Sequence, residues 1–263
     1  MSTLTAGTPD TAVPGVGRRE RRLLRLVRYV GVPLVVAVAC GAMYLYVQSR
    51  ELDSIEQRLV NADTVRRAIS TQLSISLWAT VLTLVVAIPL GIALTRPWAR
   101  RIAPYVVAVA NIGQGVPAIG LLFIIYIVAL RNGARATIVG MAIYAVLPVL
   151  RGTMVGLQQV DPGVIKAARG MGMSKLALLW RVELPLAIPI LLTGVRTALV
   201  LTVATSVLAG FIGGGTFGLL ITGGFSQNRM IAVWVGSVGA GAMAILADWV
   251  GGIAEDLLRP RGL

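Results

Sequence analysis

Long apolar runs separated by short polar segments dominate the chain. The longest runs hold about 20 residues each, and at about 1.5 Å per helical residue that length matches the hydrocarbon core of a bilayer. The pattern predicts an all-α polytopic membrane protein with about six transmembrane helices. The expected spans are 29–47, 72–95, 102–130, 136–155, 185–211 and 230–253.

The third apolar run is too long for one straight helix, and polar and helix-breaking residues interrupt it. Asn111, Gln114 and Pro117 stand in this interruption. Backbone that leaves the helix at membrane depth must be lined by protein or water. Two interpretations of Asn111 and Gln114 stay open: they line a polar path through the membrane, or they form hydrogen bonds between helices.

The segments around the runs complete the expected organisation. Residues 1–28 are predicted to form a disordered, basic N-terminal segment, 29–47 an additional membrane helix, and 48–70 an extracytoplasmic linker with a short interfacial helix. Residues 71–254 form the core, which contains the cytoplasmic polar loop 156–185. Residues 255–263 form a cytoplasmic tail.

The composition excludes a soluble domain, since 56% of the residues are apolar and only 13% are charged, against about a quarter in ordinary soluble domains. The 24 basic and 11 acidic residues give a net charge of +13. Sixteen of the basic residues fall on the side of the six spans that holds both termini, and seven fall on the other side. The positive-inside rule therefore predicts that both termini are cytoplasmic. Because membrane topology and anionic lipid headgroups account for most of the charge, we expect no nucleic-acid partner.

The residues needed for most chemistry are missing. The chain has no histidine and one cysteine, Cys40, which excludes histidine-based catalysis, an internal disulfide and metal sites rich in histidine or cysteine. Neither Lys166 nor Lys175 stands in a GxxxxGK[ST] pattern, so we expect no Walker A site. Arg196 and Asp248 are ionisable residues in or near spans. Charge balance within the bundle is the expected role of Arg196, and Asp248 is expected near the cytoplasmic interface. We predict no catalytic residue, no metal site and no cofactor in this chain.

The polar loop is predicted to form a helical hairpin. Asp161 suits the N-cap and Pro162 the first position of one helix. Ser174 is expected to cap a second helix at 175–182, which has an apolar face but no core of its own. Such a hairpin either docks on a partner or lies against its own bundle.

The bend and the end of this hairpin have their own signals. Gly170 or Gly172 ends the first helix, because glycine adopts the left-handed conformation that closes many helices. Pro185 is expected to break the chain before the fifth span.

The same loop resembles the conserved cytoplasmic loop of binding-protein-dependent ABC importer permeases. The family pattern is Glu-Ala-Ala, three residues, Gly, nine residues, then Ile-x-Leu-Pro. Two alanines, a glycine and a Leu-Pro pair match in register, whereas a lysine replaces the family's glutamate. In the family this loop is the coupling helix, which fits a groove on a separate cytoplasmic ATPase. The resemblance implies a coupling role for Lys166, Ala167, Ala168, Gly170, Gly172, Leu184 and Pro185.

Three further stretches resemble the osmoprotectant permeases, which import glycine betaine, carnitine, choline or proline. They are 74–92, 110–118 around the interruption, and the glycine-rich turn 209–215 followed by Gly218. The resemblance covers about Gln72 to the C-terminus. It implies a methionine-importer-like permease bundle with one extra N-terminal helix, in the bacterial cell membrane.

The resemblance also implies partners. They are a cytoplasmic ABC ATPase that holds ATP and Mg²⁺, a second permease copy or paralogue, and an extracytoplasmic substrate-binding protein. The candidate residues for the translocation path and its hinges are Asn111, Gln114, Pro117, Gly213 and Gly215.

Two alternatives remain. An ABC importer permease for methionine or another amino acid would share the coupling loop. The other alternative is a secondary transporter, which would need no ATPase. Paired inverted repeats would favour it, and the sequence does not show them.

Overall fold

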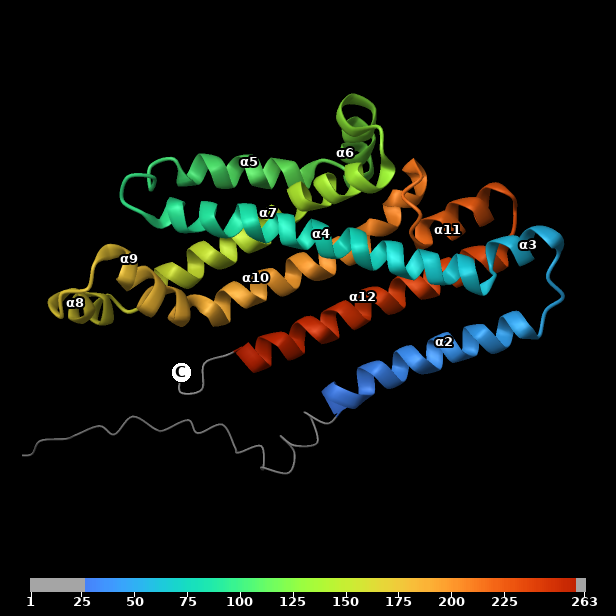
Figure 1. The fold of residues 1–263 in the computed structure, drawn as a ribbon, viewed down its shortest axis with the longest axis horizontal. Helices are drawn as coiled ribbons and strands as arrows, with labels where there is room; N and C mark the ends of the chain where they lie inside the picture. The colour runs from blue at the N-terminus through green and yellow to red at the C-terminus, as the bar shows by residue number, and fades with distance from the viewer. Residues whose placement is uncertain (1–26, 259–263) are drawn as a thin grey trace, which may run out of the picture.

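The computed structural model describes residues 27–258, and every regular element in this range is helical (Figure 1). The expectations for residues 1–26 and 259–263 lie outside the described residues. The elements in order are η1 (Val27–Gly31), α2 (Val32–Gln48), α3 (Ser54–Leu59), α4 (Ala62–Thr95), α5 (Ala103–Gly115), α6 (Ala118–Ile125), η2 (Tyr126–Leu130), α7 (Gly133–Gln158), α8 (Pro162–Gly170), α9 (Lys175–Leu178), η3 (Leu179–Glu183), α10 (Leu184–Thr205), η4 (Ser206–Ile212), α11 (Phe217–Ser226) and α12 (Met230–Leu258).

The polytopic all-α fold is confirmed. The described residues contain five helices long and apolar enough to cross a membrane, or six when one bent pair counts as a single span. That pair is Ala103–Gly115 with Ala118–Leu130, bent by 95°. The bend falls at Val116 and Pro117, where the sequence predicts an interruption. Proline there has no amide hydrogen to continue the bonding of α5.

The second span begins earlier than the apolar pattern indicates. α4 starts at Ala62, so the second half of the expected linker, residues 62–70, is helical. The Asn61 side chain caps this start by accepting a hydrogen bond from the amide of Thr64 at 2.7 Å. Ala68 is buried against Phe217 and Leu220 of α11, and this contact extends the helix past the apolar run.

The expected chain break at Pro185 is wrong. A single helical segment, Lys175–Ile212, runs through it over 38 residues. The segment holds π-helical turns at η3, directly before α10. The wider π turn accommodates a residue that cannot donate the i to i−4 hydrogen bond, so the proline no longer forces the helix to end.

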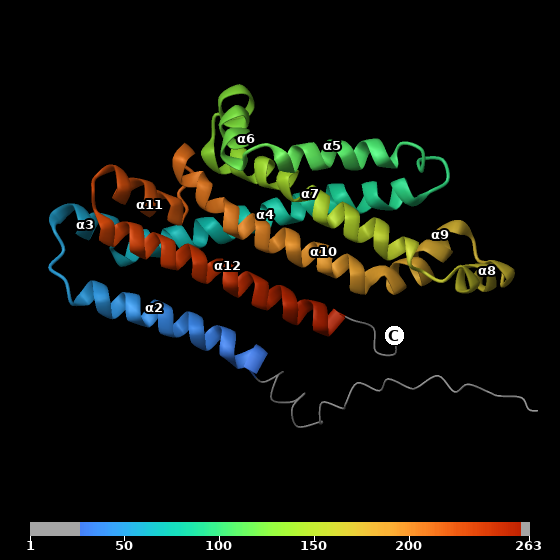
Figure 2. The ribbon, with the colours of Figure 1, turned by 180° about the vertical axis from the view of Figure 1, so that it is seen from behind.

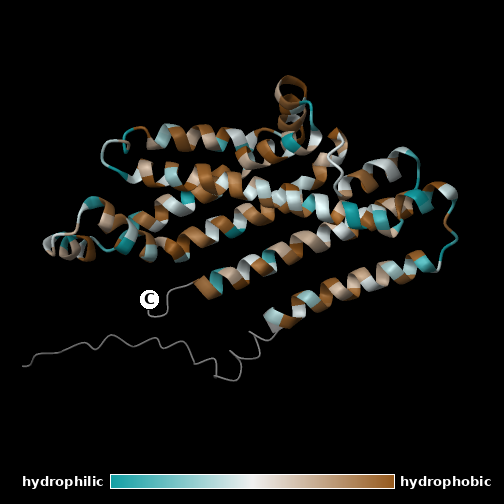
Figure 3. Ribbon diagram, in the orientation of Figure 1, coloured by the Kyte–Doolittle hydropathy of each residue, from teal (hydrophilic) through white to brown (hydrophobic). Residues whose placement is uncertain are grey.

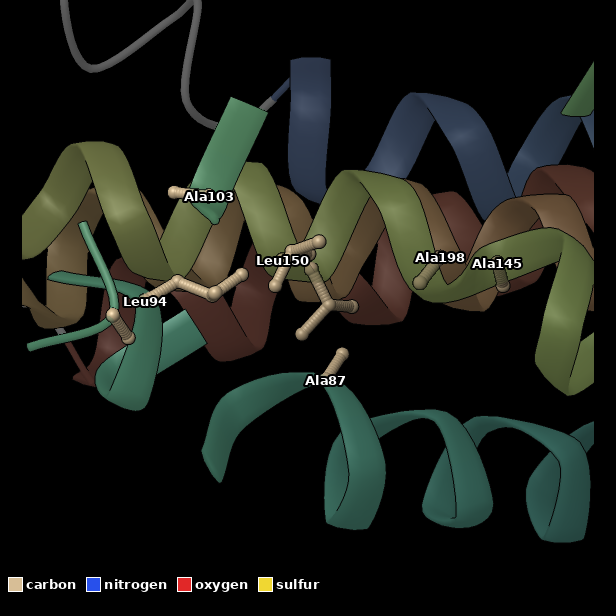
Figure 4. Close-up of a cluster of buried hydrophobic side chains, with 8 residues drawn as sticks. Ala87, Leu94, Ala103, Ala145, Leu150 and Ala198 are labelled. Carbon is tan, nitrogen blue, oxygen red and sulfur yellow. The ribbon is translucent and has the colours of Figure 1, made fainter. Parts of the chain in front are cut away.

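Small residues bring α4, α7 and α10 close together. Ala87 of α4, Ala145 of α7 and Ala198 of α10 are fully buried in one apolar cluster (Figure 4). Gly152 of α7 faces Gly194 of α10 so closely that a Cβ atom on Gly152 would lie 3.2 Å from the partner Cα atom. Side chains any larger at this crossing would push the two helices apart.

The two ends of the bundle carry different elements. α8 and α9 lie at one end, and α3 and α11 lie at the other (Figures 1 and 2). Hydrophobic residues predominate along the long helices between them (Figure 3). At the α3 end, Asp53 forms an ion pair with Arg229 at 2.6 Å. The pKa of Asp53 lies below its usual range, because the backbone amides of Glu56 and Ile55 donate hydrogen bonds to its carboxylate and Arg229 lies nearby.

The additional N-terminal helix packs along α12 (Figure 2). Trp249 Nε1 donates a hydrogen bond to the carbonyl oxygen of Tyr29 at 3.1 Å, and the Tyr29 hydroxyl donates to Asp256 at 3.2 Å. Within α2 only Val36 is buried. The helix therefore adheres along one edge of the core.

α11 was missed by the sequence pattern, which indicates only a glycine-rich turn there. The turn exists, with Gly213 and Gly215 both at φ +74°. It leads into α11, whose first residues cross η4 in backbone contact. A Cβ atom on Gly218 would lie 1.8 Å from the carbonyl oxygen of Val207, so no side chain fits.

We therefore expect Gly218→Ala to destabilise the protein by about 3 kcal/mol, the upper part of the usual range for overpacking. The measurement is the thermal unfolding temperature in detergent. The matched control is Gly241→Ala in α12, where an added Cβ atom meets nothing within 4 Å. Equal unfolding temperatures for the two variants would contradict the close crossing.

Candidate coupling hairpin and membrane path

The polar loop forms the predicted hairpin of two short helices, α8 and α9. The Asp161 carboxylate caps α8 by accepting a hydrogen bond from the amide of Gly163 at 2.6 Å. The Ser174 hydroxyl caps α9 by accepting one from the amide of Ala177 at 3.3 Å. Gly172 has φ +82°, which explains the need for glycine at the bend. The capping and bend residues indicated by the sequence thus lie where the sequence predicts them.

The hairpin presents an exposed surface at one end of the bundle (Figure 1). Among the candidate coupling residues, Lys166, Ala167, Gly170 and Gly172 are exposed. Ala168 is buried, so its side chain packs inside the molecule and is not available to a partner. Two apolar side chains that the family pattern does not single out, Met171 and Leu176, are about 70% exposed (73% and 67%).

The base of the hairpin joins the bundle through Leu184 and Pro185, both half-buried at the start of α10. Beside them, the buried Glu183 pairs with Arg96 at the end of α4, with 2.5 Å between Glu183 Oε2 and Arg96 Nη2. The sequence pattern alone does not indicate this pair. The sequence does contain a clue: Glu183 is an acidic residue directly before one span, and Arg96 is an arginine directly after another.

The polar residues near the bend form hydrogen bonds between α5 and α7. Gln114 Nε2 donates to the carbonyl oxygen of Tyr144 at 2.9 Å, and Arg151 Nη2 donates to Asn111 Oδ1 at 2.8 Å. Both hydrogen bonds join α5 to α7, so the interhelical interpretation is correct for the two side chains. Asn111 and Arg151 are nevertheless exposed, so that interpretation does not exclude a water-facing surface.

The candidate path residues do not gather at one place. Pro117 lies at the bend and is the N-cap residue of α6. Gly213 lies against the start of α7, since a Cβ atom on Gly133 would meet the Gly213 backbone at 3.0 Å. Gln114 instead contacts Tyr144 in the middle of α7, and Asn111 contacts Arg151 in its second half. The glycine-rich turn is therefore near the α11 end, and the amide pair is nearer the hairpin.

The two ionisable span residues noted in the sequence, Arg196 and Asp248, pair with each other. Arg196 on α10 makes a bidentate contact with Asp248 on α12, with nitrogen–oxygen distances of 2.8 and 2.7 Å. A second carboxylate, Glu255, lies 3.5 Å from the same guanidinium. This agrees with the charge-balance role that the sequence predicts for Arg196. Within residues 27–258 no group of three His, Cys, Asp or Glu side chains gathers in a way that could hold a metal ion.

Comparison with known sequences gives consistent matches. Residues 87–261 match the protein family described as "Binding-protein-dependent transport system inner membrane component". The chain is 37% identical over 191 residues to a glycine betaine/carnitine/choline transport system permease protein of Bacillus subtilis, covering 73% of this chain and 87% of that protein. It is 31% identical over 186 residues to a carnitine transport permease protein of Listeria monocytogenes, covering 70% and 82%.

Two solved structures are similar in fold. One shows inward-facing conformations of the MetNI methionine ABC transporter, with a TM-score of 0.66, 24% identity, and coverage of 75% of this chain and 97% of that chain. Another is an amino acid ABC transporter with histidines, with a TM-score of 0.61, 17% identity, and coverage of 80% and 99%. The methionine-importer-like bundle is thereby confirmed as the fold.

We expect Arg96→Gln to destabilise the protein by about 1–3 kcal/mol, because it leaves the Glu183 carboxylate buried without its charged partner. Thermal unfolding in detergent measures the loss. Adding Glu183→Gln to Arg96→Gln removes the unpaired charge and should recover at least half of the lost stability. A double variant no more stable than Arg96→Gln alone would contradict this account.

Proposed function

The chain belongs to the family of binding-protein-dependent transport system inner membrane components, and on that premise we propose that it is the permease subunit of an ATP-driven importer for compatible solutes such as glycine betaine, carnitine, choline or proline. As a member of that family with several apolar helices, it is a multi-pass protein of the inner membrane. The family assignment makes it the membrane-embedded component, with ATP hydrolysis on a separate subunit in our proposal.

One observation carries the substrate class. The carnitine permease of Listeria monocytogenes is 31% identical over 70% of this chain. The glycine betaine/carnitine/choline permease of Bacillus subtilis is 37% identical over 73% of it. An osmoprotectant import permease of Salmonella typhimurium is also 36% identical over 165 residues. The likeness to the methionine and amino acid transporters is 24% or less in identity and supports the fold alone. We therefore favour osmolytes over methionine.

The exposed α8–α9 hairpin is the proposed contact with the ATPase. Its exposed positions Ala167, Gly170 and Gly172 are small, so a partner surface can approach the backbone closely. Exposed Met171 and Leu176 offer apolar area beside them. ATP and Mg²⁺ belong to the partner in this proposal, which places the hairpin end, and both termini with it, in the cytoplasm.

The remaining partners follow from the same proposal. A second permease copy or paralogue completes the path between two bundles, and an extracytoplasmic binding protein delivers the solute at the end that holds α3 and α11. ATP-driven closure of the ATPases moves the hairpins, and the bundles rock between inward-open and outward-open states. The 95° bend between α5 and α6 is the proposed hinge.

We predict that Gly172→Asp leaves membrane insertion intact and abolishes ATPase binding, because it adds a charge and a side chain to the proposed contact. Co-purification of the ATPase with the tagged permease measures this. Asn228→Asp is the matched control, since Asn228 also has a positive φ, at 54°, and lies in the loop before α12 at the other end. Normal assembly of the Gly172→Asp variant would refute the docking site.

A transport assay tests the substrate class. In liposomes holding the complete transporter with its ATPase and binding protein, we expect ATP-dependent uptake of at least one of glycine betaine, carnitine, choline or proline to exceed methionine uptake at least tenfold. Uptake of methionine but none of these osmolytes would overturn the substrate assignment and leave the permease assignment intact. Uptake without the ATPase would overturn the permease mechanism.

A further inference from the structure

An arginine that the family comparison does not single out, Arg151, lies within a membrane-spanning helix. It is seven residues before the end of α7 at Gln158, which places it about 10 Å inside the helix end. Its contact Asn111 lies eight residues after the start of α5 at Ala103, at a similar depth of about 12 Å. Both estimates therefore place this guanidinium about 10 Å inside the hairpin end of the bundle, at membrane depth.

The guanidinium of Arg151 is largely uncommitted. One of its five N–H groups donates to Asn111, and the side chain forms no ion pair with any carboxylate among residues 27–258. This differs from Arg196, whose guanidinium holds Asp248 and Glu255. A lone charge costs about 2.5–3.5 kcal/mol in the middle of a membrane helix. The exposed Arg151 must therefore face water or protein, not lipid.

Two exposed hydroxyl residues lie on the same side of the bundle. Gly152 on α7 meets Gly194 on α10, and the two helices are antiparallel. Residues directly before two facing positions of an antiparallel pair lie on the same face of that pair, so Arg151 and Thr193 share a side. Thr197 follows one turn later, and both threonines are exposed. Their side chains and Asn111 make this side polar at membrane depth.

A cavity of about 450 Å³ opens along this face of α10. The recess is lined by Thr193, Thr197, Val200, Leu201 and Ala204 and by the paired Arg196 and Asp248. Because Arg196 is already paired with Asp248 and the rest of the lining is mostly apolar, the recess suits the compact apolar body of a small solute and leaves its charged end to another group. The recess therefore lies on the same side of the α7–α10 pair as Arg151, and its volume is large enough to receive such a molecule.

We propose that Arg151 binds the carboxylate end of a zwitterionic solute on the translocation path, with Asn111 orienting its guanidinium. A guanidinium presents two parallel N–H groups that match the two oxygens of a carboxylate. This inference rests on the proposed function and refines it. Glycine betaine, carnitine and proline carry a carboxylate, whereas choline carries none, so Arg151 favours the first group.

The test measures uptake of glycine betaine and choline by the complete transporter in liposomes, with saturating binding protein. We expect Arg151→Gln to lower the maximal rate of glycine betaine uptake at least tenfold and to change choline uptake less than twofold. Arg151→Lys keeps a positive charge and should retain at least a third of the glycine betaine rate. Arg135→Gln, an exposed arginine near the start of the same helix, is the control and should change neither rate.

Each other outcome has a defined meaning. An unchanged glycine betaine rate in Arg151→Gln, or an equal loss of both solutes, overturns the inference. Loss of assembly with a second permease copy would also overturn it, since Arg151 would then contact protein. If the wild type transports glycine betaine but not choline, the choline comparison is replaced by Arg151→Lys. A glycine betaine rate in Arg151→Lys as low as in Arg151→Gln then overturns the inference. A wild type that transports none of the osmolytes overturns the proposed function itself.

Discussion

Close contact between α7 and its neighbours is the constraint on which the rest of the structure depends. Lipid is as apolar as leucine, so membrane helices gain little from the hydrophobic effect when they associate and rely on close packing. Here glycines allow that packing: an added Cβ atom on Gly194 would lie 2.6 Å from the carbonyl oxygen of Pro148, and one on Gly91 would lie 2.7 Å from Thr153. With α4 and α10 held against α7, their ends define where the hairpin and the α11 region are placed.

Buried hydrogen bonds then fix how the packed helices are aligned. Gln72 of α4 is fully buried, donates to the carbonyl oxygen of Val203 at 3.3 Å, and accepts from the amide of Phe217 at 3.2 Å. One and two turns later on α4, Ser76 contacts Ser206 and Thr80 contacts Thr202. Apolar surfaces can slide over one another, but a displaced polar group in this setting loses its partner. These contacts therefore hold α10 and α11 in register with α4.

One unbroken helix connects the proposed ATPase contact to the core that holds the proposed solute site. Because the helix runs unbroken from Lys175 to Ile212, the α8–α9 hairpin is joined to the core without a hinge at Pro185. The Arg96–Glu183 pair ties the hairpin base to α4 as well. In the proposed cycle, a hairpin held by the ATPase moves with the bundle, and bending is left to the break between α5 and α6. In the proposed path, Arg151 lies on the hairpin half of that moving unit.

The sequence by itself determined the spans, the break near Pro117, the α8–α9 hairpin and the family, because length, helix-capping residues and motif spacing are local properties. It did not determine which polar residues meet. Arg96 with Glu183, Arg151 with Asn111, and Gln72 with α11 join positions separated by 87, 40 and 145 residues. The early start of α4 and the course of α11 depend on the same distant contacts. Only the tertiary structure could decide them, since a pairing between helices follows from how their faces pack and not from either segment alone.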